Sequence, residues 1–223
     1  MKNQQSGFTL IEIAIVLVII GLLLGGVLKG QELITAARVR NLVSSQDGIK
    51  AAYFGFLDRY RALPGDYSQA NAVANIPGCA GCFGGDGNGQ IQTAAESIHL
   101  WEHLSKAGFI TGSYVSGSAT PTAGATNTPA NPYGSLIQLI FDNVYREAAA
   151  DTGSVRHNLK TGINVPSDIM AEVDRKIDDG LANTGQLRHS TYNSGGTFAQ
   201  CTGTGGVWLS TTQFANCGGA LLF

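Results

Sequence analysis

The sequence predicts an α+β protein, in which one long N-terminal hydrophobic helix packs against a head that contains an antiparallel β-sheet and extra short helices. Three features predict this class. An apolar run fills the N-terminus, a helical pattern follows it as far as Pro64 and Gly65, and the C-terminal part is rich in Gly and Thr with short apolar segments. With 43% hydrophobic residues among 223, the chain can form a core of ordinary size.

The first element is a helix long and apolar enough to cross a bilayer. In residues 8–28, every residue except Thr9 and Glu12 is apolar or glycine, and about 20 such residues span a membrane as a helix. An ordinary secretory signal has a shorter apolar stretch and an A-x-A-like cleavage site, which the K-G-Q-E sequence at residues 29–32 does not offer. The run therefore predicts an anchor.

The same helix is expected to continue to about Ala62. Apolar residues recur at three- and four-residue spacing on one helical face: Ile49, Ala52, Tyr53, Phe56, Tyr60 and Leu63. Pro64 and Gly65 then end the helix. Residues 29–62 are thus expected to form an amphipathic second half of the helix.

The remainder, residues 63–223, is expected to form a globular head. Residues 111–133 are rich in Ser, Thr, Ala, Gly and Pro, which predicts a flexible surface loop. Apolar spacing predicts a helix over residues 135–150, and Ser167 is expected to cap a shorter helix that ends at Lys176. Three short apolar segments predict strands of the sheet: those around Phe198, residues 207–209 and residues 221–223.

Charge is sparse. Only 13% of residues are charged and the formal net charge is −2. A protein that coats nucleic acid needs a clustered basic face, so no nucleic-acid partner is indicated. Thirty glycines, about twice the usual share, indicate a loop-rich head.

Four cysteines form two local pairs, which fits an oxidising compartment. Cys79 and Cys82 form a C-x-x-C in a Gly-rich loop, where a structural disulfide is favoured over redox catalysis. A zinc site would need a second closely spaced pair, whereas fifteen residues separate Cys201 from Cys217.

A Gly-rich loop offers oxygen ligands for a cation. Asp86, Asn88 and Gln90 alternate with glycine, as ligands do in Ca²⁺-binding loops. The loop departs from an EF-hand because Ser97 stands at the final glutamate position, and Glu96 would substitute only with altered geometry. Structural calcium and a plain Gly/Asn turn both remain open, and no cofactor is required.

Two further patterns give weaker indications. Asp178 and Asp179 form another oxygen-rich turn and a lesser calcium candidate. His99, Glu102 and His103 match the H-x-x-E-H pattern of zinc peptidases, but the apolar residues around them are expected to face the core and leave these three on a solvated face. Since no third ligand is identifiable by spacing, no catalytic residues are expected.

The N-terminus resembles a known export signal. A short leader with Lys2, a Gly7–Phe8 junction, Glu12 four residues beyond Phe8 and an apolar span together resemble the class III signal of type IV pilins and pseudopilins. The resemblance implies a pilin-like fold, removal of residues 1–7 by a membrane-embedded prepilin peptidase after Gly7, and N-methylation of Phe8.

The resemblance also implies partners and a location. The chain would be a single-pass inner-membrane protein with a cytoplasmic N-terminus, although the basic residues that follow the span do not favour this orientation by the positive-inside rule. Inner-membrane assembly machinery would then place it in an extracellular or periplasmic filament, homo- or hetero-oligomeric with other pilins, with residues 8–28 in the filament core. There Glu12 would neutralise the Phe8 amine of a neighbouring subunit, because an unpaired buried charge is destabilising.

Cys201 and Cys217 resemble the disulfide-bounded C-terminal loop of type IV pilins, which implies that they pair. The chain is therefore expected to be a structural subunit, a major or minor pilin, of a type IV pilus-like filament and not an enzyme. The alternatives are a type II secretion pseudopilin and, from a different class, a membrane-anchored exported metal-dependent enzyme.

Overall fold

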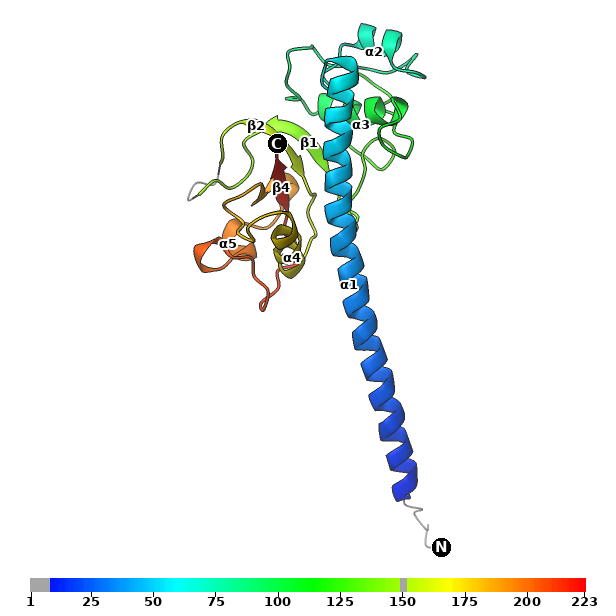
Figure 1. The fold of residues 1–223 in the computed structure, drawn as a ribbon, viewed down its shortest axis with the longest axis vertical. Helices are drawn as coiled ribbons and strands as arrows, with labels where there is room; N and C mark the ends of the chain where they lie inside the picture. Colours follow the sequence, from blue (N-terminus) through cyan, green and yellow to red (C-terminus); the bar gives the residue numbers. More distant parts are fainter. Residues whose placement is uncertain (1–8, 149–151) are drawn as a thin grey trace, which may run out of the picture. The chain divides into compact units, whose positions relative to one another are not determined.

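A computed structural model of the chain describes residues 9–148 and 152–223 and confirms the α+β class (Figure 1). The long helix α1 spans Leu10–Tyr60. The chain divides into two compact units within this helix, between Arg38 and Val39.

The first part of α1 is an apolar helix without a packing partner among residues 9–38. Every residue from Thr9 to Lys29 is exposed. Its most apolar window has a mean hydropathy of 2.8 and no buried residue, so the helix is long and apolar enough to cross a membrane.

The second part of α1 carries the core of the head. Its buried residues recur at helical spacing: Val39, Leu42, Gln46, Ile49, Ala52, Tyr53 and Phe56. They include Ile49, Ala52, Tyr53 and Phe56 of the predicted face, whereas Tyr60 is half-buried and Leu63 is buried but lies beyond the helix. The helix ends at Tyr60, two residues before the predicted end, because Arg61 adopts a left-handed φ of 53° ahead of Pro64.

The head contains a four-stranded antiparallel sheet in the order β1-β2-β4-β3. The strands are β1 (Gln138–Asp142), β2 (Arg156–Lys160), β3 (Leu187–His189) and β4 (Gly219–Leu222). The register places four leucines in one row across the sheet: Leu139 pairs with Leu159, Leu159 with Leu221, and Leu221 with Leu187. All four are buried and join the α1 residues in one hydrophobic cluster.

Short helices complete the head (Figure 1). They are α2 (Gln69–Asn75), α3 (Glu96–Lys106), α4 (Ser167–Ile177) and α5 (Phe198–Cys201), with single 3₁₀ turns at Tyr192–Ser194 and Thr204–Gly206. Ring contacts join α1 to elements far away in the sequence: Phe56 stacks on His103 of α3, and Tyr53 meets Phe223, which follows β4.

The helix predicted over residues 135–150 is wrong, because the segment contains β1. Ile137, Ile140, Phe141 and Val144 have helical spacing, but residues 136–141 also form a nearly continuous apolar run, and such a short run does not distinguish a helix from a strand. Pairing with β2 decides the outcome, since β1 exchanges its backbone hydrogen bonds with a strand about eighteen residues away.

Two of the three segments that were predicted to be strands do not form strands. The segment around Phe198 forms α5, whose start has a reciprocal capping box between Thr197 and Gln200. Residues 207–209 form only isolated bridges, whereas the predicted strand at 221–223 is confirmed as β4. The helix expected after Ser167 is present, but Ser167 does not cap it: its hydroxyl accepts from the Phe214 N–H instead.

Residues 111–133 contain no helix or strand, as predicted, but they are not uniformly at the surface. Asn127, Thr128 and Asn131 are buried. The Asn131 amide donates to the carbonyl oxygens of Thr161 and Ile163, each at 3.0 Å, so this end of the segment is fixed to the head beside β2.

Candidate functional site

The predicted processing site, Gly7 and Phe8, lies outside the described residues. The structure begins with Thr9 and Glu12, which form a capping box at the start of α1. Glu12 Oε2 accepts from the backbone N–H and the hydroxyl of Thr9, both at 2.8 Å, and Thr9 Oγ1 accepts from the Glu12 N–H at 3.3 Å. Sequence reasoning assigned Glu12 an intersubunit role and missed this local one, although the T-x-x-E spacing is its signature.

Glu12 is the single acidic residue on an exposed apolar surface between Leu10 and Leu28. Large side chains such as Leu10, Leu17 and Leu22 are 92%, 64% and 74% exposed. Contiguous apolar surface of this extent marks a membrane or protein interface. Among residues 9–148 and 152–223, no basic side chain forms an ion pair with the Glu12 carboxylate, which is therefore available to a cation from another chain.

All four cysteines are paired. Cys79 bonds to Cys82 and Cys201 bonds to Cys217, and each of the four residues is at most 1% exposed. Catalytic disulfides require an accessible sulfur atom. Burial of the C-x-x-C pair therefore favours the structural role expected from the sequence.

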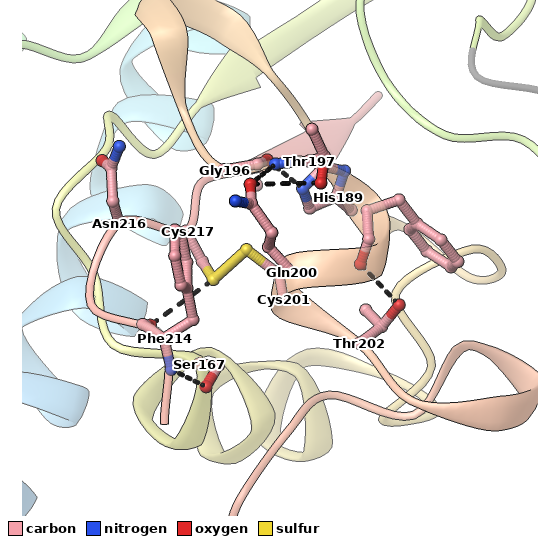
Figure 2. Close-up of a disulfide and its surroundings, with 12 residues drawn as sticks. Ser167, His189, Gly196, Thr197, Gln200, Cys201, Thr202, Phe214, Asn216 and Cys217 are labelled. Atoms are coloured by element: carbon pink, nitrogen blue, oxygen red, sulfur yellow. Dashed lines mark hydrogen bonds between the residues drawn. A yellow bond between two sulfur atoms is a disulfide. The ribbon is translucent and has the colours of Figure 1, made fainter. Parts of the chain in front are cut away.

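The Cys201–Cys217 disulfide closes a loop that is joined to the N-terminal end of α4. Figure 2 shows the contact beside the disulfide, where the Phe214 N–H donates to Ser167 Oγ at 3.1 Å. Cys217 also exchanges both backbone hydrogen bonds with Val165, at 2.9 and 3.2 Å. The loop therefore packs on the head at α4.

The zinc-peptidase pattern on α3 is internal, which corrects the expectation that it lies on a solvated face. His99, Glu102 and His103 are 1%, 5% and 0% exposed. His103 is fully used by the fold: Nδ1 accepts from the Gly65 N–H at 3.0 Å, and Nε2 lies 2.7 Å from the Phe83 carbonyl oxygen, to which it donates. Burial lowers the pKa of His103 to about 4, so the ring is neutral at neutral pH.

The candidate calcium loop is held by its own side chains. Asp86 accepts from the backbone N–H and the side-chain amide of Asn88, at 3.1 and 2.9 Å, and Asn88 Oδ1 accepts from the Gln90 N–H at 2.8 Å. These contacts are Asx turns. These hydrogen bonds occupy side-chain oxygens of Asp86 and Asn88 that were predicted to be calcium ligands. Calcium binding by Asp86, Asn88 and Gln90 stays a prediction.

Asp86 belongs to a group of three carboxylates whose proximity was not predicted from the sequence. One oxygen each of Asp66, Asp86 and Glu96 lies within 4.8 Å of the others. Asp66 accepts from the N–H groups of Gly87, Asn88 and Gly89, and Glu96 accepts from Gln92 and Thr93. Burial, as the largest cause, raises the pKa of Asp66. Both oxygens of Asp66 and Oε2 of Glu96 thus accept from backbone N–H groups.

A second group combines Asp178 and Asp179 with Asp174, again with one oxygen each within 4.8 Å of the others. Asp174 is fully buried, and its Oδ2 accepts from Trp208 Nε1 at 2.6 Å. Burial raises the pKa of Asp174 to about 7, the Trp208 hydrogen bond opposes this rise, and the charges of Asp178 and Asp179 add to it. Sequence reasoning missed Asp174; its signal was the four-residue spacing to Asp178 at the end of a predicted helix.

Comparison with known proteins identifies the N-terminal segment. Residues 2–28 match the family model of the prokaryotic N-terminal methylation motif. No curated protein and no solved structure matches the chain.

Proposed function

Because residues 2–28 carry the class III signal of type IV pilins and pseudopilins, we propose that this protein is a structural subunit, a major or minor pilin, of a type IV pilus-like filament. Prepilin peptidase removes the leader after Gly7, Phe8 is N-methylated, and the mature chain assembles through α1. The main support for the proposal is that the segment with this motif is also a helix whose apolar first part is exposed from Leu10 to Leu28.

Assembly follows from the surface that α1 exposes. Large apolar side chains require either lipid or other protein surfaces around them. In the membrane, lipid provides this environment, because the helix passes the length and hydropathy requirement for a span. In a filament, the same residues of neighbouring subunits replace the lipid.

Glu12 provides specificity in this packing. A carboxylate in an apolar environment is costly unless a cation pairs with it. Cleavage after Gly7 creates an amine at Phe8, and in the filament Glu12 of one subunit pairs with the Phe8 amine of its neighbour. Such a pair sets the axial position of one subunit against the next, whereas apolar contacts alone are non-directional.

A type II secretion pseudopilin is the alternative within the same superfamily, since it shares this N-terminal signal. The large head and the loop closed by Cys201 and Cys217 favour a pilus subunit over it. A membrane-anchored metal-dependent enzyme is disfavoured, because the H-x-x-E-H side chains are buried and His103 is engaged by the backbone.

Electron microscopy tests the proposal. Surface filaments are sheared from cells that produce the protein, labelled with an antibody against the head and analysed by peptide mapping. Labelled filaments that contain this chain support a pilus subunit. Filaments without it, together with a chain confined to the cell envelope, would favour the pseudopilin alternative.

A further inference from the structure

The C-terminal end of α4 concentrates negative charge. Asp174 lies in the last turn of α4 (Ser167–Ile177), Asp178 is its C-cap residue, and Asp179 follows. The C-terminal end of a helix carries a partial negative charge that disfavours anions and favours cations. Three carboxylates within 4.8 Å at this end therefore oppose both one another and the helix dipole.

The structure provides little compensation for this charge. In the described part of the chain, no lysine, arginine or histidine forms an ion pair with any of the three carboxylates. Arg175 and Lys176 lie in the same turn but are exposed, and Arg175 Nε donates to the Ala171 carbonyl oxygen. The charge is thus left to hydrogen bonds from neutral donors.

One buried oxygen of this group accepts no hydrogen bond from the described residues. Asp174 Oδ1 has no hydrogen-bond partner in the described residues, although Asp174 is 0% exposed; the Gly180 N–H favours the charged form of the carboxylate without satisfying this oxygen. A buried carboxylate oxygen without a partner is costly and rare. The Asp66 group differs, because backbone N–H groups donate to both oxygens of Asp66 and to Oε2 of Glu96, and neither described residue has a fully buried oxygen without a partner.

The other two carboxylates retain room for a ligand. Asp179 accepts from the Leu181 N–H at 2.9 Å and from the Thr184 hydroxyl at 2.6 Å, one bond to each oxygen. Asp178 Oδ1 accepts only from the adjacent Asp179 N–H, whereas Asp178 Oδ2 accepts from the N–H groups of Gln186 and Leu187. A carboxylate oxygen has two lone pairs, so Asp178 Oδ1 and the two Asp179 oxygens hold the turn and still offer a lone pair to a cation.

From these contacts we propose that Asp174, Asp178 and Asp179 bind a calcium ion, with Asp174 Oδ1 as the buried ligand. The donor set is hard oxygen only, which suits Ca²⁺ and not the softer metals that prefer nitrogen or sulfur.

Calcium at this position would join two parts of the head. Trp208 belongs to the loop closed by Cys201 and Cys217 and donates to Asp174 Oδ2. Ala182, in the turn after Asp179, donates to the Gly206 carbonyl oxygen at 2.8 Å in the same loop. A cation that neutralises Asp174 would therefore fix the α4–β3 turn and the disulfide loop to each other.

Calcium binding by the full-length protein in detergent micelles tests the proposal, with calcium chloride as the probe in equilibrium dialysis. We expect one site with a Kd of about 10⁻³ M or tighter, the range of extracellular calcium modules. Asp179→Asn removes one ligand charge from an exposed residue and should weaken binding about tenfold or more. Asp178→Asn is a second variant with the same expectation, and near-UV circular dichroism checks that each is folded.

Asp47→Asn is the matched control, because Asp47 is exposed and belongs to neither carboxylate group. It should bind calcium as the wild type does. Asp86→Asn tests the other carboxylate group, to which the exposed Asp86 belongs. Absence of binding by the wild type at millimolar calcium, or unchanged binding by folded Asp179→Asn and Asp178→Asn, would overturn the proposal. Loss of binding in Asp86→Asn alone would also overturn it and would assign calcium to the Asp66 group.

Discussion

Glu12 has one set of contacts in the single chain and a different one in the proposed filament. In the chain it closes the capping box with Thr9. In the filament it would also meet the Phe8 amine of another subunit. The two roles have different chemical requirements, because a cap needs only an acceptor oxygen, whereas the intersubunit pair needs a negative charge.

Glu12→Gln separates the two roles. Its amide oxygen still accepts from Thr9, but the charge is lost, so leader removal should continue while filament yield falls strongly. Leaving the neighbour's amine unpaired in an apolar core costs about 3 kcal/mol or more per subunit. The measurement is the amount of sheared surface filament relative to processed subunit in the membrane.

Thr9→Val is the control for this experiment. It removes the hydroxyl of the cap and keeps the Glu12 charge, which should cost about 1 kcal/mol in helix stability and leave filaments. Equal filament yields from Glu12→Gln and the wild type would contradict the assigned role of the carboxylate.

His103 makes the stability of the head depend on pH. Its folded pKa of about 4 lies below the ordinary value of 6.5, since burial disfavours the charged ring. The unfolded chain therefore binds a proton first as the pH falls, so the contribution of His103 is complete above about pH 6.5 and is lost towards pH 4, by about 3 kcal/mol at most.

His103→Gln tests this dependence. A glutamine offers an oxygen to the Gly65 N–H and a donor to the Phe83 carbonyl oxygen, but it does not titrate. Urea unfolding at pH 7 and pH 4.5 should show a smaller loss of stability on acidification for the variant than for the wild type. Identical losses in both proteins would show that another group governs the acid response.

At the scale of elements, the sequence predicted a helix or strand correctly where residues close in the sequence determine its structure. Helix α1 was predictable because its apolar spacing and its Pro64 stop are both local signals. Strand β1 was not, because its apolar run suits either state and β2 decides between them. The same limit applied to the sites: the residue types of Asp66 and Asp174 were visible, but their partners Gly87 and Trp208 are 21 and 34 residues away.

The two disulfides should differ in their contributions to stability. Joint replacement of Cys201 and Cys217 by serine opens the larger loop, whose closure contributes ~3 kcal/mol. Replacement of Cys79 and Cys82 opens a much shorter loop, so it should cost less, about 2 kcal/mol. Urea midpoints of the oxidised wild type and the two double variants measure this order. A larger loss for the Cys79 and Cys82 variant would contradict the loop-closure account.

At the scale of the whole molecule, the two units differ in what surrounds them. Residues 9–38 expose their apolar surface, whereas the unit from Val39 onward has a closed core of its own. A chain that begins at Val39 should therefore fold and remain monomeric without detergent, while the full chain requires it. Size-exclusion chromatography with circular dichroism measures both properties. Aggregation of the shortened chain would show that its core depends on the preceding residues.

The central claim, that the chain is processed as a prepilin and assembles through the exposed helix, is tested most directly by mass spectrometry of its N-terminus. The protein is isolated from cells with an active prepilin peptidase and from cells without one. The account predicts a chain that begins at N-methylated Phe8 in the first case and retains residues 1–7 in the second. A chain that still begins with the leader in cells with active peptidase would contradict it.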